Sequence, residues 1–361
     1  MLYRVIGLMS GSSLDGLDIA FVLLEETAGK WTFQIRETTC IPYSPEWIIK
    51  LTGLPTLSAK DYLLLHTEYG HYLGHCVNQF MEEKNLAFQV QLIASHGHTA
   101  FHLPDRHMTA QIGDGAAIAA VTGIRTISDL RSVDVALGGQ GAPIIPIGEK
   151  LLLAEYQLFL NIGGIANISA HHETIAGFDV CSANRILNLL ARDTEKGYDE
   201  DGRLAAAGKI DEGLLGQLNG LAYYKLPYPK SLSNEFSLKE VVPLILKANL
   251  SKVDALRTYV QHIVEQLSAA LNQLEVKAPT DKQRLLITGG GAHNLFLLEK
   301  LKEELVRWGI ECIVPDQQLV DYKEALVMAL MGALRWREEI NVMESVTGAS
   351  KDSINGALWT V

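Results

Sequence analysis

The first glycine turn of the sequence carries residue types that can bind a phosphate group. An apolar strand pattern over residues 2–8 enters the turn, and a second one over residues 17–24 leaves it. Glycines let the backbone approach an anion closely, and successive N–H groups with nearby hydroxyls form a concave set of donors. A tight hairpin turn without a ligand explains the same composition. The turn comprises Gly11, Ser12, Ser13, Leu14, Asp15, Gly16, Leu17 and Asp18.

The two acids of this turn predict a cation. A carboxylate beside a polyphosphate is repulsive unless a cation lies between them. Asp15 or Asp18 therefore implies Mg²⁺, held largely through water.

Two further glycine turns follow strand patterns in the second half of the chain. Gly163 and Gly164 separate two apolar segments, and Gly289, Gly290 and Gly291 lie between an apolar segment and a helical pattern over residues 295–308. Ligands of open α/β sheets bind beyond strand ends, so the three turns together predict three walls of one cleft. Neither GxGxxG nor GxxxxGK[ST] occurs, which indicates a nucleotide site of another design.

Three other side chains are placed where they can do chemistry. Asp179 ends a strand pattern just downstream of the second glycine turn, which makes it a candidate general base, with helix capping as the structural alternative. His96 follows a strand and can serve sugar-like hydroxyls, whereas a zinc site there lacks a partner carboxylate. Arg131 can bind a carboxylate or phosphate through two parallel hydrogen bonds, or pair with Asp129 or Asp134.

Composition limits the classes of ligand. The chain has 361 residues, 48% of them hydrophobic and 20% charged, with a formal net charge of −11. Binding to nucleic acid or anionic lipid needs clustered Lys and Arg, so a small molecule is favoured as the partner. Four dispersed cysteines are typical of reduced thiols. The amino terminus enters the glycine turn too soon for a signal peptide, and no apolar run is long enough to span a membrane, so we expect a cytoplasmic protein.

The elements that must position these residues alternate in type. Three strand patterns come first, followed by a helical pattern over residues 59–84 and a strand over residues 90–94. The strand, glycine turn and strand around Gly163 repeat the arrangement at the start of the chain. We therefore predict an α/β protein with a duplicated nucleotide-binding core, and residues 138–141 as a glycine hinge between its halves.

Taken in order, these segments resemble the anhydro-N-acetylmuramic acid kinases of the actin/hexokinase/Hsp70 ATPase superfamily, nearly end to end. Shorter family-like segments are residues 323–325 (KEA) and 346–349 (VTGA). The longer ones are residues 7–20 (GLMSGSSLDGLDIA), 95–99 (SHGHT), 111–119 (QIGDGAAIA), 128–143 (SDLRSVDVALGGQGAP), 161–169 (NIGGIANIS), 177–184 (GFDVCSAN) and 287–294 (ITGGGAHN).

The resemblance implies a two-lobed actin-like ATPase fold, built from duplicated ribonuclease H-like domains with an interdomain cleft. It implies one lobe over residues 1–130, completed by residues 345–361, and a second over residues 131–344. The implied activity uses ATP and water on 1,6-anhydro-N-acetylmuramic acid and gives N-acetylmuramic acid 6-phosphate and ADP, in murein recycling. A kinase for another amino sugar and a nucleotide-gated interaction module are the alternatives, and a homodimer is an open hypothesis.

The resemblance also implies residue roles. Asp179 would take the proton of the attacking water, residues 11–18 with Gly163 and Gly164 would hold the ATP phosphates, and Asp15 would face Mg²⁺. Residues 289–291 would lie against the nucleoside. His96, Arg131 and Glu324 would line the sugar site.

Three departures from the family pattern are visible. Ser12 stands where Thr is common, Val180, Cys181 and Ser182 replace a TGP-like segment, and His98 replaces a Gln. We expect loss of the proline to loosen the helix start beside Asp179.

Overall fold

The computed structural model describes residues 1–11, 14–171, 175–232, 234–276 and 283–361, and it divides into two units. Unit 1 comprises Met1–Ala154 and Tyr322–Val361, and unit 2 comprises Glu155–Asp321. The sequence-based limits were 130/131 and 344/345. The structure instead includes α4 (Ser132–Ala136), α5 (Pro146–Leu152) and most of α13 (Gln317–Trp336) in unit 1.

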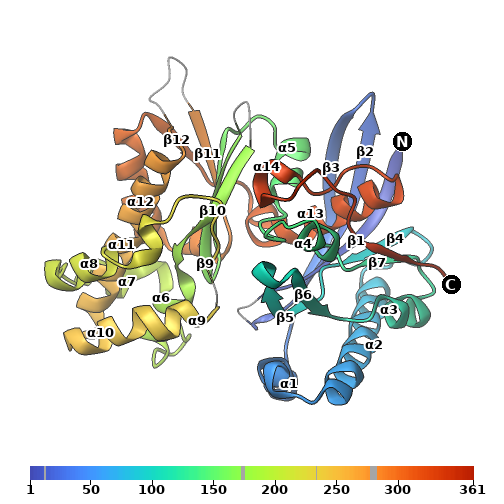
Figure 1. The fold of residues 1–361 in the computed structure, drawn as a ribbon, viewed down its shortest axis with the longest axis horizontal. Coiled ribbons are helices and arrows are strands. Elements are labelled where there is room, and N and C mark those ends of the chain that lie inside the picture. Colours follow the sequence, from blue (N-terminus) through green and yellow to red (C-terminus); the bar gives the residue numbers. More distant parts are fainter. Residues whose placement is uncertain (12–13, 172–174, 233, 277–282) are drawn as a thin grey trace. The chain divides into compact units, whose positions relative to one another are not determined.

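Unit 1 contains a six-stranded sheet in the order β13-β7-β4-β1-β2-β3 (Figure 1). The first three strands form an antiparallel meander, and β4 and β7 then add in parallel beside β1. Their apolar residues face the core, with Ile6, Leu8 and Ile93 fully buried. The strands are β1 (Leu2–Ser10), β2 (Gly16–Thr27), β3 (Lys30–Pro42), β4 (Leu92–Ser95), β7 (Thr126–Ser128) and β13 (Ala357–Trp359).

Helix α13 packs closely on this sheet because two glycines remove side chains from the contact. A Cβ on Gly7 of β1 would lie 1.9 Å from the Ala325 carbonyl oxygen, and one on Gly332 would lie 2.5 Å from the Ala94 Cβ. Elsewhere in unit 1 are α1 (Pro45–Gly53), α2 (Ala59–Glu83), β5 (His98–Leu103), β6 (Met108–Ile112), α3 (Gly115–Thr122) and α14 (Glu344–Thr347).

Unit 2 repeats the strand arrangement of unit 1. Its sheet has the order β10-β9-β8-β11-β12, in which β8, β9 and β10 are antiparallel neighbours while β11 and β12 add in parallel beside β8. This repetition confirms the predicted α/β class and the duplication of its core. The strands are β8 (Leu158–Ile162), β9 (Ile165–His171), β10 (Ile175–Ser182), β11 (Gln283–Thr288) and β12 (Ile310–Ile313).

The core of unit 2 lies between this sheet and its helices. Helix α11 (Lys252–Gln273) starts at Ser251, whose side chain accepts a hydrogen bond from the Asp254 N–H, and it buries Leu256, Tyr259 and Ile263 at helical spacing. The other helices are α6 (Asn184–Ala191), α7 (Arg203–Ala207), α8 (Glu212–Asn219), α9 (Asn234–Phe236), α10 (Val242–Ala248) and α12 (Leu295–Arg307).

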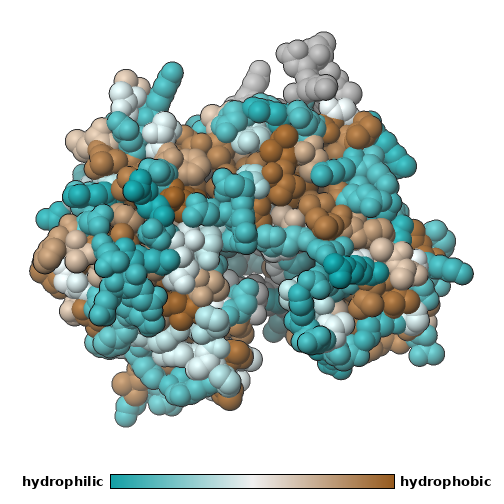
Figure 2. Space-filling view, turned by 180° about the vertical axis from the view of Figure 1, so that it is seen from behind, coloured by the Kyte–Doolittle hydropathy of each residue, from teal (hydrophilic) through white to brown (hydrophobic). Residues whose placement is uncertain are grey.

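The surface mixes hydrophilic and hydrophobic residues, as Figure 2 shows for one face. Within the described residues, none of the helices is long and apolar enough to cross a membrane. The helical patterns at residues 59–84 and 295–308 are confirmed by α2 and α12 to within one residue at each end.

Candidate functional site

The predicted first hairpin is present in unit 1. β1 and β2 pair up to Ser10 opposite Leu17, which leaves the turn between them. A Cβ on Gly16 would lie 2.7 Å from both the Cys40 Sγ and the Ile41 carbonyl oxygen, so the close approach of β3 requires glycine here. Leu14 has a positive φ of 59°. Ser12 and Ser13 lie outside the described residues.

The two acids of this hairpin differ in exposure. Asp15 is exposed, and its Oδ1 accepts a hydrogen bond of 3.1 Å from the Gly16 N–H. Asp18 lies opposite Met9 in β2 and is half-buried. An exposed carboxylate beside the turn fits a magnesium ion held through water, because Mg²⁺ keeps several waters in most protein sites.

His96 lies at the carboxyl end of β4, beside the end of β1. Its N–H donates to the Leu8 carbonyl at 3.1 Å, and its side chain is 3% exposed. Its Nδ1 lies 2.9 Å from the Gly97 carbonyl, which can only accept, so Nδ1 carries the proton. Its buried Nε2 has no hydrogen-bond partner among the described residues and is an acceptor for a ligand hydroxyl. Burial, and then the charge of Arg131, lower the His96 pKa well below its usual value.

Arg131 lies close enough to His96 for its positive charge to lower the pKa of the imidazole. It precedes α4, just beyond the end of β7. Burial and then the Arg131 charge also lower the pKa of His102 to about 4. The predicted grouping of His96 with Arg131 is therefore present in unit 1. The acids considered as its structural partners have other contacts: Asp129 bonds to the Ser132 hydroxyl, and Asp134 accepts from Thr347.

The glycine stretch at residues 138–141 is held within unit 1. The Asp134 carboxylate accepts hydrogen bonds from the Thr347 hydroxyl at 2.6 Å and the Gly141 N–H at 2.8 Å. A Cβ on Gly139 would lie 2.3 Å from the Asp134 Oδ2. The family-like segment at residues 346–349 thus anchors this stretch, which sequence reasoning assigned to a hinge.

Glu324 is half-buried on α13 between two fixed neighbours. Lys323 forms a 2.9 Å ion pair with Glu149 of α5, and both side chains are almost fully buried. Ala325, which follows Glu324, contacts the backbone of β1 at Gly7. These contacts restrict the backbone that carries the Glu324 carboxylate.

In unit 2 the second glycine turn contacts the start of α6. The carbonyl of Gly164 accepts from the Ala183 N–H at 2.8 Å, and that of Gly163 accepts from the Asn184 N–H at 3.1 Å. The turn is thereby joined to the segment that follows Asp179.

The third glycine turn lies against the carboxyl end of β8, the strand that the second glycine turn follows. Gly289 has φ +82°, and a Cβ there would lie 2.7 Å from the Asn161 Oδ1, while one on Gly291 would lie 2.2 Å from the Ile162 Cγ2. Asn184 donates from Nδ2 to the Ile162 carbonyl at 3.0 Å. Sequence reasoning gave no role to Asn161 and Asn184. Asparagines directly beside glycine turns were the available signal.

Asp179 is half-buried on β10, and its carboxylate is oriented by the backbone. Its Oδ2 accepts from the Leu232 N–H at 2.8 Å, and its own carbonyl accepts from the Tyr223 hydroxyl at 2.5 Å. A β-bulge lies between Asp179 and Cys181. The cap position of α6 is Ala183, without a side-chain capping bond, so Asp179 does not cap that helix.

A lysine missed by sequence reasoning lies beside Asp179. The Lys230 carbonyl accepts from the Asp179 N–H at 3.3 Å. Its ammonium lies 5.0 Å from the Phe178 ring centroid and 4.9 Å from that of Tyr223, and burial lowers its pKa. The ammonium also donates to the Leu226 carbonyl at 3.0 Å, so the hydrogen bond between Lys230 and Asp179 joins backbone atoms only.

The segment that replaces the family's TGP pattern is anchored rather than loosened. The buried hydroxyl of Ser182 lies 2.7 Å from that of Ser237, and its carbonyl accepts from Tyr259 at 2.9 Å. These bonds hold the segment that leads into α6. Cys181 is fully buried, and burial, then the charge of Asp179, raise the pKa of its thiol, so it stays protonated.

The predicted residues are divided between the two units. Gly11, His96 and Arg131 lie just beyond the carboxyl ends of β1, β4 and β7, which is where open α/β sheets bind ligands. Unit 1 carries Gly11, Asp15, His96, Arg131 and Glu324. Unit 2 carries Asp179 with the second and third glycine turns. Within the parts that the structure describes, no group of three or more His, Cys, Asp or Glu side chains is placed to hold a metal directly.

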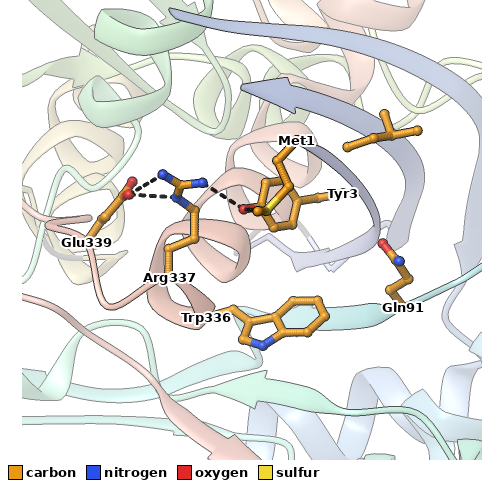
Figure 3. Close-up of a pocket in the computed structure, with 7 residues that line it drawn as sticks. Met1, Tyr3, Gln91, Trp336, Arg337 and Glu339 are labelled. Atoms are coloured by element: carbon orange, nitrogen blue, oxygen red, sulfur yellow. Dashed lines mark hydrogen bonds and ion pairs between the residues drawn. The ribbon is translucent and has the colours of Figure 1, made fainter. Parts of the chain in front are cut away.

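A surface pocket of about 510 Å³ in unit 1 contains none of these residues. Figure 3 shows that Arg337 points toward both Glu339 and the hydroxyl of Tyr3, beside Trp336. Arg337 and Glu339 form an ion pair in this pocket.

Comparison with known proteins gives one consistent result. A family model described as anhydro-N-acetylmuramic acid kinase matches residues 3–361. Proteins of that name from Aliivibrio fischeri and Haemophilus influenzae are 34% and 32% identical, over 99% and 98% of this chain and 99% and 97% of theirs. A solved activator of the 2-hydroxyisocaproyl-CoA dehydratase from Clostridium difficile, with bound ADPNP, has a TM-score of 0.44 and 15% identity over 93% of this chain and 96% of its own. That likeness is too low to bear on function.

Proposed function

The chain belongs to the anhydro-N-acetylmuramic acid kinase family, and from that premise we propose that it opens 1,6-anhydro-N-acetylmuramic acid with ATP and water, giving N-acetylmuramic acid 6-phosphate and ADP. The enzyme is a phosphotransferase of murein recycling. The match over residues 3–361 carries the proposal. The backbone-oriented carboxylate of Asp179 supports it from the site.

Asp179 acts as the general base in this proposal. The water oxygen forms a bond to the anomeric carbon while the bond from that carbon to O6 breaks, and the carboxylate takes the water proton. O6 then forms a bond to the γ-phosphorus as the bond to ADP breaks. Because the Leu232 N–H holds one carboxylate oxygen, the base has a defined orientation before substrate binds. Capture of O6 by phosphorus prevents the 1,6-anhydro bridge from forming again.

The residues of unit 1 have complementary roles toward the sugar. The neutral Nε2 of His96 accepts a hydrogen bond from a sugar hydroxyl, and Arg131 binds the sugar's carboxylate through two parallel bonds. Glu324 accepts from further hydroxyl or amide donors. The glycine turns at residues 11–18, 163–164 and 289–291 bind ATP. Asp15 would hold Mg²⁺ through water, and the ion would supply positive charge against the phosphates.

The reaction is tested by incubating the full chain with ATP, Mg²⁺ and the anhydro sugar in water enriched in oxygen-18. We expect ADP release that requires the sugar, and one heavy oxygen at the anomeric carbon of the product. Phosphorylation of a different amino sugar without ring opening would support the second kinase hypothesis. Nucleotide binding with no sugar-dependent ADP would support an interaction module.

The role of the base is tested by Asp179→Asn. We expect a fall in kcat of at least about 10²-fold with little change in ATP affinity, because the loss is confined to proton transfer. Asp193→Asn, which removes an exposed acid paired with Lys252, is the control and should retain full turnover. Unchanged sugar-dependent turnover by Asp179→Asn would contradict the assignment.

A further inference from the structure

A chain of four buried polar side chains ends at the last residue before the first glycine turn. The Tyr69 and Tyr43 hydroxyls are 2.6 Å apart, the Tyr43 hydroxyl lies 2.7 Å from the Ser10 Oγ, and the Ser10 Oγ lies 2.9 Å from the His98 Nδ1. The four side chains come from α2, the segment after β3, the end of β1 and the start of β5. None is more than 7% exposed.

The direction of this hydrogen-bond chain follows from the number of protons. Tyr43 donates its only hydroxyl proton to Ser10, so the Tyr69 hydroxyl must donate to Tyr43. Ser10 in turn has one proton, and the His98 Nδ1 is the partner that can accept it. His98 therefore carries its own proton on Nε2.

The charge state of each member supports this direction. Burial raises the pKa of both tyrosines far above neutrality and lowers that of His98 to about 4. None of these groups ionises near pH 7, so the proton order is maintained. A protonated His98 would instead present a donor to Ser10, and the chain would have to reorganise.

We propose that His98 is a positioning residue for nucleotide binding, which holds the Ser10 hydroxyl and so sets the backbone that enters the glycine turn at Gly11. This inference rests on the proposed role of that turn as a phosphate site. With its proton donated to His98 and a lone pair occupied by Tyr43, Ser10 is a structural anchor rather than a phosphate donor. Backbone N–H groups are then left to bind the anion.

These hydrogen bonds require an acceptor at position 98 rather than an imidazole as such. A glutamine carbonyl oxygen can accept the Ser10 proton, whereas an apolar side chain cannot. Loss of the acceptor leaves a buried hydroxyl without its partner, which costs free energy. Only part of this cost reaches the turn, so we expect a change in nucleotide affinity of about fivefold to tenfold.

The test measures binding of the non-hydrolysable analogue ADPNP with Mg²⁺ to the full chain by calorimetry, and separately binding of the anhydro sugar alone. His98→Leu and Tyr43→Phe should weaken ADPNP binding about fivefold to tenfold and leave sugar affinity unchanged. His98→Gln should restore binding to within about twofold. Tyr62→Phe, on α2 but outside the chain of four, is the matched control and should bind as the unsubstituted protein does.

Two results would overturn the proposal: unchanged ADPNP affinity in His98→Leu and Tyr43→Phe, or equal weakening in His98→Gln and His98→Leu. If His98→Leu loses its cooperative thermal transition, the proposal is judged from the ADPNP affinity of Tyr43→Phe, because that substitution removes one oxygen and preserves the ring. The readout is independent of turnover. If the unsubstituted chain releases no sugar-dependent ADP but these affinities change as stated, the proposed reaction fails while the positioning role stands.

Discussion

At the scale of single residues, the structure distinguishes the side chains that we propose to bind ligand from those that hold other groups in place. Asp179 and His96 each have one atom oriented by the backbone, and for His96 this leaves Nε2 as an acceptor. Ser182, Thr347 and Ser10 instead use their hydroxyls on buried protein partners. Some motif residues are therefore candidates for ligand binding or catalysis, and others hold neighbouring segments in place.

Arg131 provides a test of carboxylate binding. Arg131→Lys keeps the charge but removes the planar pair of donors, so we expect KM for the sugar to rise about tenfold or more while KM for ATP changes little. Arg125→Lys changes a cation over the Trp336 ring elsewhere in unit 1 and serves as the control. An equal rise in both KM values for Arg131→Lys would argue against a sugar-specific role.

The buried histidines predict a loss of stability in acid. Burial holds the pKa of His98 at about 4 and that of His262 at about 3, below the value of 6.5 for an exposed histidine. The unfolded chain therefore binds more protons from pH 6.5 down to about 4 for His98 and about 3 for His262, so stability is complete above pH 6.5 and falls as pH decreases through these windows. Each group should cost about 2 kcal/mol between pH 7 and pH 5.

Urea unfolding of the full chain at pH 7 and pH 5 measures this effect. His98→Gln should show a smaller difference between the two pH values than the unsubstituted protein, because one of the shifted groups is gone. An identical difference would mean that His98 does not titrate as its burial indicates.

At the scale of elements, glycine determines how closely strands and helices approach. Gly7 lets α13 contact β1, and Gly16 lets β3 pass beside the first turn. Both contacts place backbone atoms where a Cβ would be, so the neighbours cannot move aside as a flexible side chain would.

Gly7→Ala tests the contact between β1 and α13. A Cβ only 1.9 Å from the Ala325 carbonyl oxygen must displace the helix, and we expect a destabilisation of about 3 kcal/mol or more. Gly53→Ala has open space around the new methyl group and is the control. Chemical denaturation compares the two, and similar unfolding midpoints would show that the contact is not needed.

At the scale of the whole molecule, the proposed reaction divides its residues between the two units. The residues proposed to bind the sugar belong to unit 1, and the residue proposed as general base belongs to unit 2. Residues that act on the same chemical step are strongly non-additive when removed together.

The double variant Arg131→Ala with Asp179→Asn tests this division. If both residues act on one bound sugar, the loss in kcat/KM should be smaller than the product of the two single losses. Arg131→Ala combined with Asp193→Asn should show no such coupling. Fully multiplicative losses in the first pair would indicate independent effects.

The sequence by itself predicted the main helices and strands and proposed the residues for the chemistry. Strand and helix periods located β1, α2 and α12, and the glycine turns with Asp179, His96 and Arg131 gave the candidate residues. These features depend on local spacing, which is written along the chain. The sequence also indicated the duplication, through the second strand, glycine turn and strand.

Only the tertiary structure decided which polar residues are held by others. The links from Ser10 to His98, from Ser182 to Ser237 and from Asp134 to Thr347 join positions 88, 55 and 213 residues apart. The orientation of Asp179 by Leu232 likewise spans 53 residues. A hydrogen bond forms between atoms that packing brings within about 3 Å of each other. The spacing of residues along the chain does not specify which distant atoms are brought that close.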